Sequence, residues 1–522
     1  FLLAVRKIFY WVWLWQLKEY RLDRVLVHLQ ETEQGKNIFF SKLSILKLSA
    51  IFSFILIGSD SRLLTAYQVF ILLVFIYEAY LLYKELSKKK FKKPVFTIKA
   101  LILVCFAFAL TSILFVLPFV DRYLWILILD KLTPFFVAFF IFIFSFPSTI
   151  YTDIQIERAI KKIRENRHLL VIGVTGSYGK SSTKEYLSQI LSKKFKVAKT
   201  RGTNNTPIGI ANSILKDLAD DTKIFVVEMG AYQKGEIKEL CQIVAPKIGI
   251  ITAINNQHLS LFGNIKNTMS GKYELIESLP KNGLALFNGN NENAKLLFEK
   301  TEINKVLYET LQSMNKKSKE STICAFNIKT QKSSISFDIQ LKKEVTKMYT
   351  SLIGAHNVEN ILPAIFIANY LGMSMEEIQV AVENLTSLPK TMEKYTFSNN
   401  ATLIDDSFNT NPNSILAVLN YIQVYKGIKV LVMQPMIELG KDSKLEHEKI
   451  GEEISKISDY LFLTNNNYYK YILKGCEKRK NNCVIEVAST KTISDFIIKN
   501  VKEDDVVLFE GKESNAVLSK FL

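Results

Sequence analysis

The chain has 522 residues, of which 48% are apolar and 12% aromatic, and its 67 basic and 50 acidic side chains give a formal net charge of +17. This composition excludes a disordered chain, a collagen-like chain and a small disulfide-bonded scaffold. The five cysteines form no CxxC pair and show no metal-ligand spacing, so we expect reduced thiols in a reducing compartment.

Charge is distributed unevenly along the chain. Residues 1–147 contain 18 basic and 9 acidic side chains, whereas residues 148–522 contain the other 49 and 41. The second part is only mildly basic for its size and has no basic stripe interleaved with aromatic residues, the pattern that nucleic-acid binding needs. We therefore expect no nucleic-acid partner.

Five apolar runs organise the first 147 residues. They are Leu2–Leu17, Leu43–Ile57, Thr65–Tyr83, Ile98–Val120 and Tyr123–Phe146. Because a bilayer core of roughly 30 Å needs about 20 apolar residues in a helix, the last three runs are long enough to cross it and the first two are shorter. The runs predict a membrane region with about five transmembrane helices. The alternative is a set of buried core helices.

Lysine placement orients these helices. Residues 84–99 contain seven lysines and one glutamate, and a basic loop of this length stays in the cytoplasm. The chain after Phe146 then emerges on the same side through a basic connector, residues 148–167. We expect a multi-pass protein of the cytoplasmic (inner) membrane whose remaining domains lie in the cytoplasm. Residues 18–30 are typical of an amphipathic helix on the inner membrane surface.

Three ionisable residues, Glu78, Asp130 and Lys131, fall within the predicted spans. Charges are costly inside a bilayer, so residues of this kind line a polar path, lie near a span end or pair with a neighbouring helix. The sequence leaves these interpretations open.

A glycine-rich loop opens the part of the chain after the connector. Residues 168–174 predict a buried strand and residues 181–193 a helix. Seven residues at this junction are candidate nucleotide ligands: Thr175, Gly176, Ser177, Gly179, Lys180, Ser181 and Ser182. Backbone N–H groups and the helix N-terminus would hold phosphate oxygens, Lys180 would reach the β- and γ-phosphates, and Ser181 would bind Mg²⁺. Val174 stands where the usual spacing has glycine, so a chance glycine-rich turn is the alternative.

Two further strands are each followed by a candidate metal ligand. Glu228 ends the second apolar strand, and His258 lies just past a third. In an open α/β sheet, ligands bind beyond the carboxyl ends of the strands, so both side chains can meet the phosphates. Taken singly, Glu228 fits a solvated strand end and His258 a surface histidine. Together with the glycine-rich loop they form a candidate pair of metal ligands.

Seven motifs in a fixed order carry a family resemblance. They are GVTGSYGKSSTKE (173–185), TRGTNNTPIG (200–209), VVEMGAYQKGEI (226–237), GKYE (271–274), GAHNVEN (354–360), DDSFNTNP (405–412) and MIELG (436–440). From about residue 168 to 522 the chain resembles the Mur ligases, ATP-dependent amide-forming enzymes of cell-wall peptide assembly. Within that family it is most similar to the members that attach a D-alanyl-D-alanine dipeptide.

The resemblance implies roles for the candidate residues. Lys180, Lys272 and His258 would be catalytic. Ser181 and Glu228 would bind one Mg²⁺, and His258 would help to bind a second. Lys272 aligns with a lysine that many members carry as a carbamate, in which CO₂ turns a cation into an anionic metal ligand; the alternative is an ordinary surface lysine.

The resemblance also assigns residues outside the phosphate loop. Asn360 would contact adenine, and Asp406 would contact the nucleotide from the last domain. Three asparagines would lie near the substrate: Asn205, Asn409 and Asn411.

Three positions depart from the family pattern. Thr391 replaces an arginine that would touch the γ-phosphate, Gln434-Pro435 replaces Gly-Asp, and the C-terminal KGSR-like segment reads EGKESN from Glu510. Lys390 or Lys394 can replace the missing charge, although a lysine makes no bidentate contact. The largest departure is at the front, where membrane helices stand in place of the small UDP-sugar domain of soluble members.

The predicted fold is multi-domain, with transmembrane helices followed by a central α/β P-loop ATPase domain (168–393) and a C-terminal Rossmann-like α/β domain (394–522). The resemblance implies an ADP-forming ligase that joins an amino acid or dipeptide to a cell-wall precursor carboxylate through an acyl phosphate, with ATP, two Mg²⁺ ions and a possible lysine carbamate. The acceptor is lipid-linked in one hypothesis, and the helices are a simple anchor or a bundle for a partner protein in the other. An ATP-driven transport or regulatory protein, or a Mur-like ligase with a non-cell-wall substrate, is the alternative function.

Overall fold

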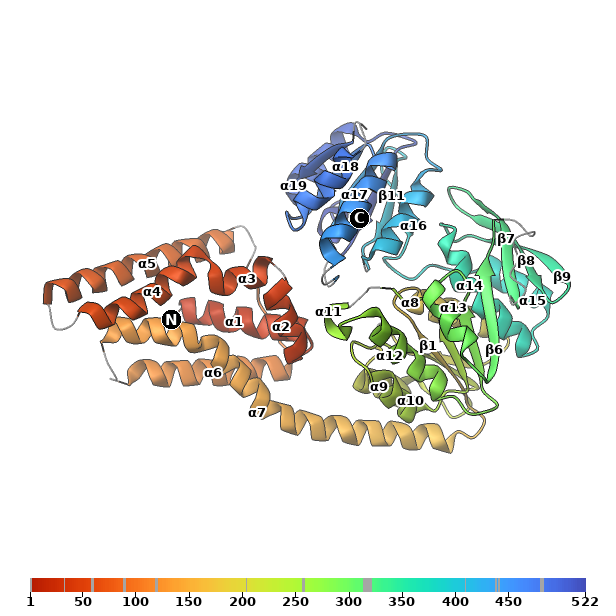
Figure 1. The fold of residues 1–522 in the computed structure, drawn as a ribbon, viewed down its shortest axis with the longest axis horizontal. Coiled ribbons are helices and arrows are strands. Elements are labelled where there is room, and N and C mark those ends of the chain that lie inside the picture. Colours follow the sequence, from red (N-terminus) through yellow and green to blue (C-terminus); the bar gives the residue numbers. More distant parts are fainter. Residues whose placement is uncertain are drawn as a thin grey trace. The chain divides into compact units, whose positions relative to one another are not determined.

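The computed structural model describes residues 2–31, 33–57, 61–87, 91–117, 121–202, 204–255, 259–312, 322–408, 410–436, 439, 442–478 and 483–522. The chain divides into two compact units, Phe1–Asp153 and Ile154–Leu522 (Figure 1). Each unit contains its own clusters of buried apolar side chains.

The regular elements of the first unit, in the part that the structure describes, are all helices. Its helices are α1 (Leu2–Leu17), α2 (Leu22–Glu31), α3 (Glu33–Phe40), α4 (Lys42–Ile57), α5 (Ser61–Ser87), α6 (Ile98–Val116) and the first part of α7 (Arg122–Glu165). Four described segments are long and apolar enough to cross a membrane, namely Gly35–Phe54, α5, α6 and α7. With 16 residues, α1 spans only about 24 Å, less than a bilayer core. The helical region is confirmed, and its membrane location stays a prediction.

Ionisable side chains of the first unit pair with one another. Lys47 Nζ on α4 donates to Glu78 on α5 at 2.5 Å and to Asp130 on α7 at 3.1 Å. Lys131 Nζ donates to Ser44 Oγ at 2.6 Å. A buried charge is costly unless it is paired, so these contacts tie α4, α5 and α7 together. Pairing with a neighbouring helix is the interpretation that the structure confirms.

The predicted basic connector is a continuation of the last long helix. Helix α7 runs without interruption from Arg122 to Glu165, through most of residues 148–167. Ala159 and Ile163 of this helix are buried in an apolar cluster of the second unit, to which they belong. The helix therefore supplies part of the core that supports the phosphate loop.

A nine-stranded sheet forms the first part of the second unit, in the order β2-β3-β1-β4-β5-β6-β7-β8-β9. Its strands are β1 (Leu170–Thr175), β2 (Val197–Lys199), β3 (Ile224–Glu228), β4 (Ile248–Ile251), β5 (Leu284–Asn288), β6 (Asn304–Thr310), β7 (Ile323–Thr330), β8 (Ile335–Leu341) and β9 (Glu344–Thr350). The strands from β1 to β7 run parallel to their neighbours, whereas β7, β8 and β9 pair antiparallel. One edge of the sheet is therefore antiparallel, formed by β7, β8 and β9.

Helices cover both faces of this sheet. They are α8 (Lys180–Leu191), α9 (Pro207–Asp217), α10 (Glu236–Val244), α11 (Leu259–Phe262), α12 (Ile265–Glu277), α13 (Glu292–Glu299), α14 (His356–Tyr370) and α15 (Met375–Glu383). Successive residues Val171 and Ile172 of β1 lie in different apolar clusters, because side chains alternate between the two faces of a strand. Strand β1 is therefore buried on both sides, which fixes the position of the loop that follows it.

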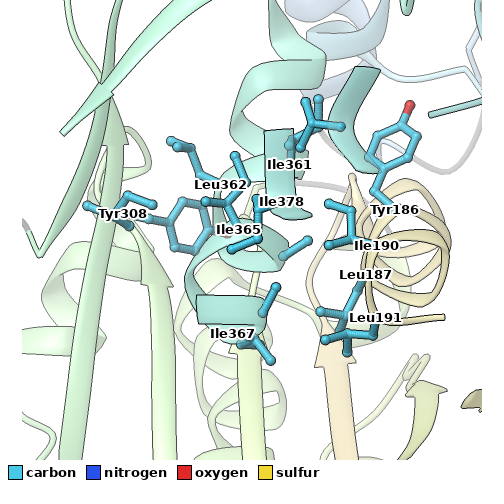
Figure 2. Packing of buried hydrophobic residues seen from close by; sticks show 14 of the residues in the cluster. Tyr186, Leu187, Ile190, Leu191, Tyr308, Ile361, Leu362, Ile365, Ile367 and Ile378 are labelled. Atoms are coloured by element: carbon cyan, nitrogen blue, oxygen red, sulfur yellow. The ribbon is translucent and has the colours of Figure 1, made fainter. Parts of the chain in front are cut away.

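The packing of α8 against α14 holds the helix after the phosphate loop. Figure 2 shows Leu187 and Ile190 of α8 beside Ile361 and Ile365 of α14. The exposed fraction of each of these side chains is 0%. Burial of this kind contributes roughly 1.5–3 kcal/mol for each large aliphatic side chain, so the direction of α8 is set by its apolar face.

The last part of the second unit is a six-stranded sheet in the order β10-β11-β15-β12-β13-β14. Its strands are β10 (Glu393–Thr396), β11 (Thr402–Asp406), β12 (Lys429–Met433), β13 (Tyr460–Leu463), β14 (Val484–Val487) and β15 (Val506–Glu510). Its helices are α16 (Pro412–Ile422), α17 (Ser443–Ile457), α18 (Tyr469–Glu477), α19 (Thr490–Asn500) and α20 (Asn515–Leu518). All neighbours are parallel except β10 and β11, so the predicted Rossmann-like α/β domain is confirmed.

Candidate nucleotide and metal site

The loop between β1 and α8 has a shape that only glycine allows at two positions. Gly176 and Gly179 have φ angles of +153° and +79°. A Cβ atom would lie 2.1 Å from Thr252 Oγ1 at Gly176 and 2.6 Å from Asn360 Oδ1 at Gly179. Both contacts are too short for a side chain, so the backbone is held close to its neighbours. This arrangement fixes the path of the loop into the N-terminus of α8, the end of a helix that favours an anion.

Lys180 is the first residue of α8, and its ammonium group folds back over the loop. Its Nζ atom donates to the carbonyl oxygens of Gly176 at 2.8 Å and Ser177 at 3.2 Å. Burial lowers the pKa of Lys180, and the charge of Glu228 partly opposes that shift. The positive end of the α8 dipole and this ammonium group lie at the same place, where phosphate oxygens are stabilised.

Ser181 and Glu228 form a pair of oxygen ligands beside the loop. Strands β1 and β3 are in register with Val174 opposite Glu228, which brings the carboxylate to the start of α8. Ser181 Oγ donates to Glu228 Oε2 at 2.9 Å, and Asn205 Nδ2 donates to Glu228 Oε1 at 3.4 Å. Mg²⁺ prefers a few protein oxygens together with water and phosphate oxygens, so the pair fits this ion.

Lys272 lies on α12 and is almost completely buried, with 3% of its surface exposed. Its Nζ atom donates to Ala231 O at 3.5 Å and lies 5.7 Å from the centroid of the Phe262 ring. Burial lowers the pKa of Lys272 to about 7, and the positive charge of Lys180 adds to this effect. A substantial fraction of the amine is therefore neutral near pH 7, the form that reacts with CO₂. The environment fits a carbamate.

Several residues predicted to bind the nucleotide make contacts within the protein. Thr175 Oγ1 donates to Met229 O at 2.9 Å, and Ser177 Oγ accepts from Asn255 N at 3.1 Å. Ser182 is largely buried in the first turn of α8. Asn360 lies against Gly179, since a Cβ atom added at Gly179 would lie 2.6 Å from Asn360 Oδ1. Thr175, Ser177 and Asn360 therefore shape the loop, and their nucleotide contacts stay predictions.

In the C-terminal domain, Asp406 and Glu510 lie opposite each other at the ends of β11 and β15. Asp406 Oδ1 accepts from Met392 N at 3.1 Å, and Glu510 Oε1 accepts from Ser414 Oγ at 3.1 Å. Burial raises the pKa of Asp406 to about 7 and that of Glu510 well above its ordinary value. The neighbouring Asp406 raises the pKa of Glu510 further, whereas hydrogen bonding to Glu510 partly opposes the rise at Asp406. Burial therefore disfavours two negative charges at this place.

Asn411 is the N-cap of α16, and its side-chain oxygen accepts from Asn413 N at 3.0 Å and Ser414 N at 3.1 Å. Its substrate contact stays a prediction. His258 and Asn409 lie outside the described residues.

Two charged residues at these sites are absent from the sequence-based prediction. Lys184 contacts Glu228, and its position four residues after Lys180 places both lysines on one face of α8. Glu510 ends a buried strand, as Glu228 does. The rule that ligands gather at strand ends would have found Glu510.

Known proteins share both domains of the second unit. Residues 174–368 match the Mur ligase middle domain, and residues 392–513 match the glutamate ligase domain of Mur ligases. The UDP-N-acetylmuramoyl-tripeptide–D-alanyl-D-alanine ligase of Escherichia coli is 29% identical over 290 residues, which cover 56% of this chain and 63% of that protein. The Bacillus subtilis protein of the same name is 27% identical over 354 residues, or 65% of this chain and 72% of that protein. The match to the E. coli relative thus spans slightly less than two thirds of its length.

Solved structures show the same fold. The MurF structure from Acinetobacter baumannii aligns with a TM-score of 0.63 and 24% identity, covering 70% of this chain and 79% of that one. The MurF ligase of Thermotoga maritima, solved in complex with ADP, aligns with a TM-score of 0.62 and 23% identity, covering 71% of this chain and 83% of that one. Two consecutive family domains, a matching fold and the convergence of the loop, Glu228 and Lys272 lead to one conclusion: the chain belongs to the Mur ligase family.

Proposed function

We propose that the protein is an ATP-dependent, ADP-forming amide ligase. The observation that carries this proposal is the Ser181–Glu228 oxygen pair beside the ammonium of Lys180, with the buried amine of Lys272 close enough to interact electrostatically with Lys180 and Glu228. The names of the relatives support the same reaction class.

The reaction proceeds in two steps. The carboxylate of the acceptor attacks the γ-phosphorus of ATP, which gives an acyl phosphate and releases ADP. The neutral amine of the second substrate then attacks the acyl carbon, which forms the amide, expels inorganic phosphate and releases one proton. Both steps build negative charge on phosphate oxygens, so a fixed positive environment is the main source of acceleration.

The residues of the loop divide this work. Lys180 exchanges its loop carbonyls for phosphate oxygens of the bound nucleotide. Ser181 and Glu228 hold Mg²⁺, which when bound supplies positive charge that offsets the charge of the phosphoryl group. Lys272, as a carbamate, would add an anionic oxygen ligand for Mg²⁺, and His258 would help to hold a second ion.

The substrates we propose are a cell-wall peptide precursor and an amine resembling D-Ala-D-Ala. The names of the E. coli and B. subtilis relatives support this pair. We further propose that the acceptor is linked to a lipid at the cytoplasmic membrane face. Within the described residues, four segments long and apolar enough to cross a membrane precede the ligase domains. A tethered acceptor has a high effective concentration.

A screen of amines tests the ligase chemistry. The full chain is purified in detergent and mixed with ATP, Mg²⁺ and an acceptor, and phosphate release is followed for each amine, with Lys180→Ala as the blank. We expect release that requires both the acceptor and one class of amine. ATP hydrolysis that is unaffected by any acceptor or amine would favour the transport or regulatory alternative.

A second comparison tests the acceptor. UDP-linked and lipid-linked precursors are supplied at equal concentration, and ADP release is measured. We expect faster turnover with the lipid-linked form, and equal turnover would remove the reason for a lipid-linked acceptor and leave the helices as an anchor.

A further inference from the structure

Lys184 is a buried charge whose role the proposed reaction leaves open. It lies on α8, one helical turn after Lys180, and only 1% of its surface is exposed. An ammonium group is expensive to bury, and its burial is tolerated only where its partners replace the lost water. Its two partners therefore indicate what it does.

The first partner is the proposed metal ligand. Lys184 Nζ donates to Glu228 Oε2 at 3.0 Å, and this is the same oxygen that accepts from Ser181 Oγ at 2.9 Å. The Glu228 side chain is 2% exposed, so water contributes little to its stabilisation. Within the described residues, Lys184 is the cation bonded to this carboxylate, at the position that a metal ion would share with Ser181.

The second partner lies in the loop that carries the predicted substrate residue. Lys184 Nζ donates to Gly202 O at 2.6 Å. The same loop contributes Asn205, whose Nδ2 atom donates to the other oxygen of Glu228 at 3.4 Å. One ammonium group thus links the phosphate-loop helix, the proposed metal ligand and the loop around Gly202.

We propose that Lys184 is a positioning residue that acts as the counter-cation of Glu228 before metal binds and couples metal binding to the loop around Gly202. The inference rests on the proposed function of the site. In the metal-free protein the ammonium holds the Glu228 carboxylate in place beside Ser181. With metal present the same positive charge repels the ion, so metal binding is weaker and more readily reversible. The hydrogen bond to Gly202 meanwhile holds the loop around Gly202 in place.

The test is Lys184→Met, which keeps the length and removes the charge. The full chain in detergent is titrated with Mn²⁺ in the presence of ADP, and bound Mn²⁺ is followed by electron paramagnetic resonance. Because the repulsion between a divalent ion and a nearby ammonium is lost, we expect Mn²⁺ to bind roughly tenfold more tightly than to the wild type. In EDTA, the thermal unfolding midpoint of the variant should lie below that of the wild type. Addition of Mn²⁺ and ADP should raise the midpoint of the variant by more than it raises that of the wild type.

Lys199→Met is the matched control. Lys199 lies on β2 and pairs with Glu185 of α8, and this ion pair is more exposed than that of Lys184 and Glu228. It should leave Mn²⁺ affinity unchanged. Unchanged or weaker Mn²⁺ binding in Lys184→Met, or a stability loss that metal does not reverse, overturns the inference and leaves a purely structural lysine. A wild-type protein that binds neither ADP nor Mn²⁺ would instead overturn the proposed function.

Discussion

At the scale of single residues, burial tunes two groups of this protein toward neutral pH. Lys272 loses most of its water on α12 and lies near the charge of Lys180, so its pKa falls to about 7. Asp406 is buried opposite Glu510, so its pKa rises to about 7. In both cases desolvation disfavours the charged form, which lowers the pKa of an amine and raises that of an acid.

The Lys272 environment predicts a dependence on bicarbonate. Activity should fall in CO₂-depleted buffer and return when bicarbonate is added, and the stimulation should fade as pH drops below about 7, because the protonated amine cannot attack CO₂. Lys272→Ala should lower kcat by roughly 10²–10³-fold, the usual effect of removing one charge-stabilising group. The measurement is ADP release between pH 6 and 8. Full activity of Lys272→Ala would contradict the assigned role.

The Asp406–Glu510 pair predicts a dependence of stability on pH. Between about pH 4 and 7 the folded protein keeps a proton on Asp406 that the unfolded chain releases, so the free energy of unfolding falls as pH rises. Asp406 alone should contribute about 2–3 kcal/mol to the change between pH 5 and 8, and Asp406→Asn should remove that part. Urea unfolding at several pH values measures how the free energy of unfolding changes with pH, as one slope for the wild type and one for Asp406→Asn. Equal slopes would show that the pair is ionised in the folded protein.

At the scale of elements, the phosphate site depends on where β1 ends and α8 begins. Strand β1 is buried on both faces, and α8 is held against α14 by aliphatic side chains (Figure 2). The loop between them is short and left-handed at Gly179, and it passes close to Asn360. A small change in this loop should therefore affect ligand binding more than it affects the fold.

Gly179→Ala tests this expectation, with Gly372→Ala as its control. Gly372 has a similar φ of +87° but no heavy atom within 4 Å of an added Cβ, whereas Gly179 faces Asn360. Both variants should lose roughly 1–2 kcal/mol of stability through backbone strain. Only Gly179→Ala should also weaken ADP binding, by about tenfold or more, in isothermal titration calorimetry. A similar ADP affinity in both variants would remove the claimed role of the loop shape.

At the scale of the whole molecule, the ligase domains and the helical region are separate compact units. The apolar clusters of Ile154–Leu522 are formed within that unit, so it should fold without residues 1–153. We expect the truncated chain to bind ADP as the full chain does.

The two chains should differ in how they fractionate. The full chain should stay with membranes after alkaline carbonate treatment, whereas residues 154–522 should remain in the aqueous fraction, because the long apolar helices belong to the first unit. Release of the full chain by carbonate would contradict the predicted membrane region.

Local sequence patterns were enough to predict many of the elements and the phosphate loop. The length of the apolar runs predicted the helices of the first unit, and the alternation of strands with helices predicted the C-terminal α/β domain, because both patterns are local. The order of Gly176, Gly179, Lys180 and Ser181 is local too. Tertiary structure alone decided which distant groups meet: the register of β1 and β3 brings Glu228 to Ser181, and the register of β11 and β15 brings Glu510 to Asp406. Burial of Lys184 and Lys272 was likewise invisible in the sequence, because the water around a lysine is displaced by neighbours that are remote along the chain.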